Sequence, residues 1–309
     1  MKLSLNNITC ALALTSSSLV WADNQSDFIL NAELGAGLIH NSALSVDELD
    51  DVSSQSDSGH ELYGSIKAKW QATDKAKLMA SYAYNQKQYS EYSQYDLALH
   101  QISVDGSYQL QSSELGMRID AASADLAGDT FLTYQQVSVY HGKFLQPETY
   151  LRSSIKHKVK SFTELPSRDA SGVGANVDLF HFLNGANTML LLGVNAEQEN
   201  AEEQQFDYWA VGFNTKVTHK FDVFGLSSKV GLGLRYQKKD YQTFNLESQQ
   251  DNENIERDEN RKIVELNWQL HVLDNLSVNA QWQYGDYQSL ISSQTYEQNI
   301  TSVRLNYSF

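Results

Sequence analysis

The chain has 309 residues, with 23 Lys+Arg against 38 Asp+Glu, so its formal net charge is −15. Two prolines and a single cysteine exclude a collagen and a disulfide-stapled scaffold. The acidic balance argues against a general nucleic-acid binder, because phosphate affinity comes from Lys and Arg. No stretch after the first residues has the roughly 18 apolar residues that a membrane-spanning helix needs. The mean hydropathy of −0.45 still allows a membrane barrel, because each barrel strand is half polar.

The first 22 residues predict a secretory signal peptide. Lys2 supplies a positive start, residues 8–20 supply a mildly apolar stretch, and Ala22 ends a small-residue cleavage pattern. A buried first strand is the alternative. With a cut after Ala22, the mature chain spans residues 23–309 and loses Cys10, which is the only cysteine. An exported chain without disulfides suits a large fold closed by backbone hydrogen bonds.

From Phe28 onward, apolar and polar residues alternate, which predicts strands with one apolar and one polar face. Near the end, Val303, Leu305 and Tyr307 share one face and alternate with polar residues. Fourteen segments follow this pattern: 27–41, 59–72, 76–89, 95–110, 114–125, 130–144, 149–163, 172–183, 187–198, 205–220, 227–242, 260–273, 275–288 and 296–309.

The lengths of the segments and of their connections favour a transmembrane barrel over a soluble sandwich. Soluble strands usually have about five or six residues, whereas a tilted membrane-spanning strand has about 9–11. Connections after even segments are short, and the longest ones after odd segments are residues 42–58 and 243–259. This asymmetry and an even strand number are typical of outer-membrane barrels. The sequence thus predicts an all-β fold: a transmembrane antiparallel barrel of about 14 strands after a cleaved signal peptide, with both termini on the periplasmic side.

In such a barrel the apolar faces contact lipid and the polar faces line the lumen. Aromatic residues join an apolar body to a polar tip and favour the membrane interface. We expect this role, in contact with outer-membrane lipid and lipopolysaccharide, for Trp70, Tyr84, Trp209, Trp268, Trp282 and Phe309.

The predicted lumen carries more basic than acidic residues, although the whole chain is acidic. Rings of Lys and Arg in a pore favour anions. The alternative is that these charges neutralise one another. The acidic residues on the polar faces are Glu33, Glu61, Asp105, Asp120, Asp178, Glu197 and Glu265. The basic ones are Lys67, Lys69, Arg118, Arg152, Lys156, Lys158, Lys160, Lys216, Lys220, Lys229, Arg235, Lys239 and Arg304.

The acidic excess lies in residues 42–58, 197–207 and 247–259, where Glu199 is one of the carboxylates. Carboxylate clusters can hold Ca²⁺ or Mg²⁺, but their spacing does not match a calcium loop, so we expect solvated loops and no metal or cofactor. The eight histidines are spread one per segment without a His-Glu-x-x-His pattern, and no Gly-x-Ser-x-Gly sequence occurs. We therefore predict no catalytic residues. An outer-membrane hydrolase, whose groups meet only in space, is the least favoured alternative.

The ending Leu305-Asn306-Tyr307-Ser308-Phe309 resembles the terminal signal of bacterial outer-membrane β-barrel proteins. The resemblance implies that the barrel-assembly machinery of the Gram-negative outer membrane is a partner. Arg304 stands where that signal commonly has glycine. In size and strand number the chain is similar to monomeric fourteen-stranded porins, which implies a channel for small polar or anionic solutes.

Residues 35–110 also resemble the barrel domain of the surface lipoprotein assembly modifier family. The resemblance is carried by Gly37-Leu38-Ile39-His40-Asn41, Tyr82-Ala83-Tyr84 and Asp96 to His100. It implies, as the alternative function, an export barrel for a surface protein or polysaccharide with a periplasmic partner. Members usually carry a helical-repeat domain before the barrel, and no such domain is recognised here. Whether residues 42–58 and 243–259 fold inward and plug the lumen is not decided by the alternation.

Overall fold

The computed structural model describes residues 28–242, 244–245, 254–255 and 257–309. The predicted signal peptide and its cut after Ala22 lie outside these residues. Among the described residues, no helix has the length and the apolar character that crossing a membrane requires.

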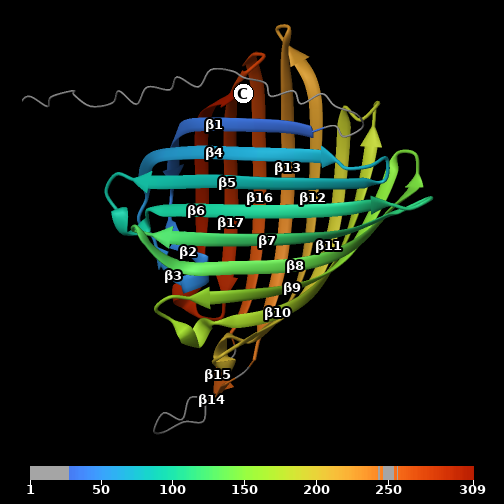
Figure 1. Ribbon diagram of the computed structural model, residues 1–309. Coiled ribbons are helices and arrows are strands. Elements are labelled where there is room, and N and C mark those ends of the chain that lie inside the picture. The colour runs from blue at the N-terminus through green and yellow to red at the C-terminus, as the bar shows by residue number, and fades with distance from the viewer. Residues whose placement is uncertain (1–27, 243, 246–253, 256) are drawn as a thin grey trace, which may run out of the picture.

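The chain forms one closed antiparallel barrel of fourteen strands (Figure 1). The barrel strands are β1 (Phe28–Asn41), β4 (Asp57–Gln71), β5 (Ala76–Tyr89), β6 (Leu97–Gln109), β7 (Glu114–Leu126), β8 (Asp129–Gln146), β9 (Thr149–Phe162), β10 (Ala170–Leu183), β11 (Thr188–Ala201), β12 (Tyr208–Val223), β13 (Leu226–Tyr241), β16 (Asp258–Leu273), β17 (Leu276–Ser289) and β18 (Tyr296–Ser308). The predicted fold class is confirmed, and each strand begins and ends within three residues of its predicted segment.

The barrel closes where the first strand pairs with the last. Glu33 lies opposite Ser308 and Asn41 lies opposite Ile300, in an unbroken antiparallel register. The backbone N–H of Phe309 donates to the carbonyl of Ala32 at 2.9 Å. Full closure leaves no edge strand with unpaired backbone groups, which is a condition for crossing a bilayer with strands.

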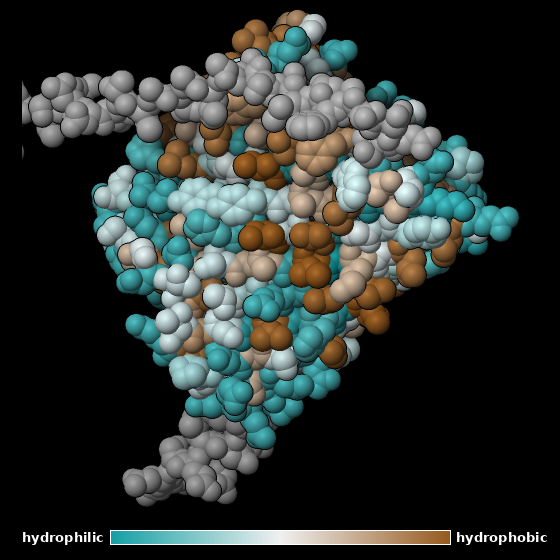
Figure 2. Space-filling view, in the orientation of Figure 1, coloured by the Kyte–Doolittle hydropathy of each residue, from teal (hydrophilic) through white to brown (hydrophobic). Residues whose placement is uncertain are grey.

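The barrel is inverted relative to a soluble protein, with its apolar side chains outside. Leu38, Ile155 and Val173 are 63%, 68% and 58% exposed on the outer surface, whereas Lys158 and Glu197 are buried inside. Figure 2 shows hydrophobic residues over the middle of the outer wall and hydrophilic residues toward the ends of the strands. Apolar surface of this extent needs lipid rather than water around it.

The two ends of the barrel differ in their connections. At one end, called here the short-turn end, β12 and β13 are joined by Phe224 and Gly225, which both have positive φ. Two-residue hairpins need this left-handed backbone because it matches the strand twist. At the opposite, long-loop end the connections are mostly longer, and residues 127–128 form its one tight turn among the described residues.

Candidate functional site

The structure places the predicted basic residues on the inner faces of the barrel strands, in the same alternation as the buried polar side chains. They do not form one ring. β9 contributes a column of four, and the others are distributed over β4, β7, β12, β13 and β18. These inner-face residues are Lys67, Lys69, Arg118, Arg152, Lys156, Lys158, Lys160, Lys216, Lys220, Lys229, Arg235, Lys239 and Arg304.

The column on β9 is held by carboxylates on β11, across the intervening strand β10. Lys158 Nζ lies 3.1 Å from a Glu197 oxygen and 2.7 Å from a Glu199 oxygen. Lys156 reaches Glu197 at 2.9 Å, and Lys160 reaches Glu199 at 3.3 Å. Tyr208 on β12 donates its hydroxyl to Glu199 at 3.0 Å. Paired and hydrogen-bonded in this way, the charges tolerate burial that isolated charges would not.

Glycines on β10 leave room for the lysine side chains of β9 to extend across β10 to β11. A Cβ atom at Gly172 would lie 2.9 Å from Lys158 Cε, and one at Gly174 would lie 2.7 Å from Lys156 Cε. Both distances are shorter than an ordinary carbon contact of about 3.5–4.0 Å. The missing side chains therefore let the lysines lie flat over β10 and reach the next strand.

Residues 42–56, which connect β1 to β4, form an infolded loop inside the barrel (Figure 1). The loop contains β2 (Leu44–Val46), the 3-10 turn η1 (Asp47–Leu49) and β3 (Asp51–Ser53). Three of its acidic residues contact cations of the wall and of the other connections. Glu48 lies 2.8 Å from Lys160, and Asp47 lies 3.3 Å from Arg261.

Asp50 is held by two arginines at the long-loop end. Arg168, in the turn after β9, donates to one of its oxygens at 2.7 Å, and Arg257, just before β16, donates to the other at 2.5 Å. Arg257 also lies 2.8 Å from Glu259. Burial alone would lower the pKa of Arg257, but Tyr241, Asp50 and Glu259 outweigh that effect and raise it.

Apolar contacts and hydrogen bonds hold the infolded loop in place in addition to these ion pairs. Leu44, Val46 and Tyr95 form a buried cluster, and Tyr95 donates its hydroxyl to Asp51 at 3.0 Å. Gln298 of β18 donates its amide to the carbonyl of Ala43 at 2.6 Å. The first of the two loops that the sequence left undecided is therefore inside the lumen. The second, 243–259, falls largely outside the described residues.

The expectation of solvated acidic loops is wrong for part of the carboxylates that the structure describes, although Glu202 and Glu203 are exposed as expected. Asp47, Glu48 and Asp50 are paired with wall or loop cations, and Glu199 and Glu259 are 6% and 5% exposed. The physical reason is that a loop folded into the lumen meets the basic inner wall, which offers each carboxylate a partner that open water does not.

Glu48 has the most perturbed acid–base equilibrium of the infolded loop. Enclosure by the barrel wall alone would raise the pKa of its carboxyl group. The charges of Lys160, Lys239 and Arg261 outweigh that effect and lower the pKa to about 2. The loop therefore stays negatively charged, and stays attracted to the wall, throughout the neutral range.

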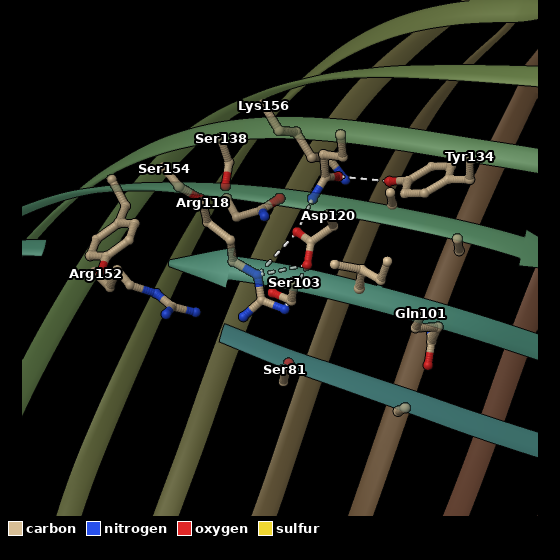
Figure 3. Close-up of a pocket in the computed structure, with 17 residues that line it drawn as sticks. Ser81, Gln101, Ser103, Arg118, Asp120, Tyr134, Ser138, Arg152, Ser154 and Lys156 are labelled. Carbon is tan, nitrogen blue, oxygen red and sulfur yellow. Dashed lines mark hydrogen bonds and ion pairs between the residues drawn. The ribbon is translucent and has the colours of Figure 1, made fainter. Parts of the chain in front are cut away.

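A cavity of about 420 Å³ opens to the lumen along the inner faces of β5 to β10 (Figure 3). We call it the wall groove. Its polar side chains come from alternate positions of neighbouring strands. They are Ser81, Gln101, Ser103, Arg118, Asp120, Tyr134, Gln136, Ser138, Tyr140, Arg152, Ser154, Lys156 and Asn176.

The lumen toward the short-turn end has a different charge balance. Lys67, Lys69 and Lys229 point inward and form no ion pair within the described part of the chain. Lys216 and Arg235 share one carboxylate, Glu265, at 3.5 and 3.3 Å. Inward carboxylates such as Glu33 and Glu114 also lie toward this end, but cations outnumber them there. The infolded loop, by contrast, brings carboxylates to the long-loop end.

Sequence reasoning missed several inward cations, among them Lys87, Arg257 and Arg261. The alternation signal was present for Lys87 on β5 and for Arg261 on β16, each facing a lumen residue of the neighbouring strand in the register. Arg257 precedes its strand, and no periodicity could have indicated its partners Asp50 and Glu259.

The predicted interface aromatics lie on the outer surface at different heights. Trp70 and Phe309 are near the short-turn end, Trp268 lies five residues from the end of β16, and Trp209 is near the long-loop end. Trp268 donates its indole N–H to Ser228 at 2.7 Å. Tyr84 and Trp282 lie nearer the middle of their strands. Their contact with the membrane interface stays a prediction.

Most histidines lie outside the lumen, and several of them are bonded across to a neighbouring strand. His40, His181 and His219 contact Ser58, Thr149 and Thr188 at 2.8 to 2.9 Å. His100 lies 3.9 Å from Asp125 and contacts the hydroxyl of Tyr82. Within the described residues, no group of three or more His, Cys, Asp or Glu is arranged to hold a metal ion.

Comparisons with known proteins give matches by structure alone. No model of a known protein family matches the chain, and no curated protein matches its sequence. The outer membrane channel DcaP of Acinetobacter baumannii is similar with a TM-score of 0.54 and 9% identity, over 93% of this chain and 99% of that one. OmpT, an outer membrane protein of Vibrio cholerae, is similar with a TM-score of 0.51 and 10% identity, over 94% and 100%.

CdiB from Acinetobacter baumannii matches 91% of this chain with a TM-score of 0.48 and 10% identity, and the chain spans 60% of its length. At these identities the likeness concerns the fold. The chain therefore has the closed, apolar-sided antiparallel barrel of Gram-negative outer-membrane β-barrel proteins, with a charged lumen narrowed by its own first long loop.

Proposed function

We propose that the protein is a porin-like channel that passes small polar solutes and prefers anions. The observation that carries the proposal is the excess of cations toward the short-turn end, where Lys67, Lys69 and Lys229 have no carboxylate partner among the described residues. Fixed cations on a pore wall attract anions and repel cations. A barrel of this strand number is also wide enough to leave a lumen, since side chains fill the interior only near about eight strands.

The infolded loop sets the narrow part of this pathway. Its carboxylates neutralise Lys160, Arg257 and Arg261 at the long-loop mouth. The preference for anions then arises at the short-turn end, which an outer-membrane barrel directs to the periplasm. The proposed passage needs no catalytic residue.

Single-channel conductance of the refolded protein in a planar bilayer, under a KCl gradient, tests the proposal. We expect an open pore whose reversal potential shows a preference for chloride. Replacing Lys67, Lys69 and Lys229 by glutamine should lower that preference. Lys143→Gln, an exposed lysine on the outer face of β8, is the matched control and should leave it unchanged.

A folded barrel that carries no current, or one that prefers potassium, would contradict the proposal. A barrel that carries no current in the bilayer, together with an altered cell surface in a deletion strain, would instead favour the export function.

A further inference from the structure

The wall groove combines two kinds of chemistry within about 420 Å³. Two guanidinium groups, from Arg118 and Arg152, point into the same space as the hydroxyl groups of Ser81 and Ser103 (Figure 3). A space of this size has room for a solute of one sugar unit with its hydration, and it opens sideways into the lumen.

The two arginines of the groove are turned toward the lumen and their carboxylates are turned away, whereas the third cation, Lys156, is 16% exposed and paired with Glu197. The Arg118 side chain is 46% exposed, and its partner Asp120, at 2.8 Å, is 20% exposed. Arg152 is 40% exposed, and its partner Asp178, at 3.4 Å, is 17% exposed. A solute in the lumen therefore meets guanidinium groups first, although each is formally neutralised from behind.

The position of each guanidinium is fixed before any solute arrives. Arg118 donates from Nε and Nη2 to Asp120 at 2.8 to 3.0 Å. The guanidinium carbon of Arg152 lies 5.6 Å from the Tyr140 ring centroid and 5.8 Å from that of Phe180. Such pre-organised forks bind a carboxylate with little further loss of side-chain freedom.

The rest of the groove offers neutral hydrogen-bonding groups. Ser81, Ser138, Ser154 and Gln101 line it and form no side-chain hydrogen bond with another described residue. Hydroxyl and amide groups without internal partners suit a solute that carries several hydroxyl groups of its own.

We propose that the wall groove is a binding site for a small polyhydroxylated carboxylate of the sugar-acid class. The carboxylate lies against Arg118 and Arg152, and the solute hydroxyls bond to the serines and Gln101. This assignment rests on the proposed channel function and adds a substrate class to it. A simple carboxylate would contact only the arginines, and a neutral polyol would contact only the serines and Gln101.

Three probes of similar size distinguish the contact with the arginines from the contacts with the serines and Gln101: gluconate, sorbitol and hexanoate. Gluconate has both the charge and the hydroxyls, sorbitol has only the hydroxyls, and hexanoate has only the charge. Titration calorimetry of the refolded protein in detergent micelles measures binding whether or not the pore conducts. We expect gluconate to bind at least about tenfold more tightly than either other probe, a difference of about 1.4 kcal/mol.

Variants assign the binding to the groove. Arg118→Gln and Ser154→Ala should each weaken gluconate binding, and Arg118→Gln should bring it close to the affinity for sorbitol. Ser153→Ala is the matched control, because Ser153 neighbours Ser154 but faces the outer surface. If Arg118→Gln fails to fold, Arg152→Gln tests the same contact from β9.

The outcomes separate this inference from the channel proposal. Equal affinity for gluconate, sorbitol and hexanoate, or gluconate binding that survives both arginine variants, overturns the groove assignment even if the pore conducts. Selective gluconate binding by a barrel that carries no current retains the site and removes the channel.

Discussion

Gly172 and Gly174 leave the inner face of β10 bare at the two positions where lysines of β9 cross it. A Cβ atom at Gly172 would also lie 2.7 Å from the backbone carbonyl of Gln198. The backbone cannot move aside as a flexible side chain would, so the position requires glycine for close packing and not for its φ angle.

We expect Gly172→Ala to destabilise the barrel by about 1–3 kcal/mol, the usual cost of overpacking a filled interior. Urea unfolding in lipid vesicles, followed by tryptophan fluorescence, measures the change. Gly106→Ala is the control, because a Cβ atom there would lie 3.7 Å from the Leu78 side chain, at ordinary contact distance. Equal unfolding midpoints for the two variants would contradict this account.

For single residues, the sequence indicated which side chains face the lumen but not which of them form ion pairs with one another. Glu199 illustrates the limit. The alternation ended its strand at residue 198, whereas β11 continues to Ala201, so a buried carboxylate was assigned to a solvated hairpin end. Its partner Lys158 lies two strands away, and a period of two contains no information on contacts across a third strand.

The infolded loop is the element that distinguishes this lumen from an open cylinder. It is held by ion pairs as well as by an apolar cluster, in which the partly buried Leu49, Tyr89, Tyr92, Leu126 and Phe131 pack against Leu44, Val46 and Tyr95. Its docking should therefore respond to pH and to salt.

The pKa of Glu48 sets the direction of that response. Because its folded pKa, about 2, lies below its ordinary value of 4.5, the stabilisation by its charge is complete above pH 4.5. That stabilisation is lost as the pH falls from 4.5 toward 2. Single-channel conductance should rise over this interval as the loop loosens.

Glu48→Gln should raise the conductance at neutral pH and flatten its rise in acid. Glu164→Gln is the control, because Glu164 is an exposed carboxylate of the connection after β9. A conductance that is the same in wild type and Glu48→Gln at every pH would show that the Lys160 contact does not hold the loop.

The contacts of this loop lay beyond sequence reasoning. Glu48 and Lys160 are 112 residues apart, and Asp47 and Arg261 are 214 residues apart. Periodicity within a strand reports the direction of side chains relative to the sheet. It does not report how far a polar connection extends across the space that the sheet encloses.

For the whole molecule, the closed barrel, with its seam between β1 and β18, is the feature that the sequence indicated most strongly. Strand length, turn asymmetry and an even number of segments each depend on local sequence, so the architecture could be predicted without knowing any long-range contact. The register of the seam could not, and it is set by pairs such as Ala36 with Leu305.

Directly opposed residues in antiparallel strands have Cα atoms about 4.5–5.5 Å apart, within reach of a disulfide. A chain expressed from residue 23, which lacks Cys10, should therefore form a disulfide between cysteines placed at Ala36 and Leu305. The product is read as a reduction-sensitive shift on a denaturing gel. Cysteines at Ala36 and Val303, two residues out of register, should couple poorly, and equal coupling of both pairs would argue against this register.

The infolded loop belongs to the first connection of the chain, yet Arg257, Arg261, Tyr296 and Gln298 that hold it belong to the final segments. During biogenesis these partners arrive last, and contacts over such sequence separations form slowly. The nascent barrel therefore lacks these contacts with the loop until its last strands are in place. Its narrowing and the completion of its wall are one late event, so a chain interrupted before its final strands would have neither a closed wall nor a docked loop.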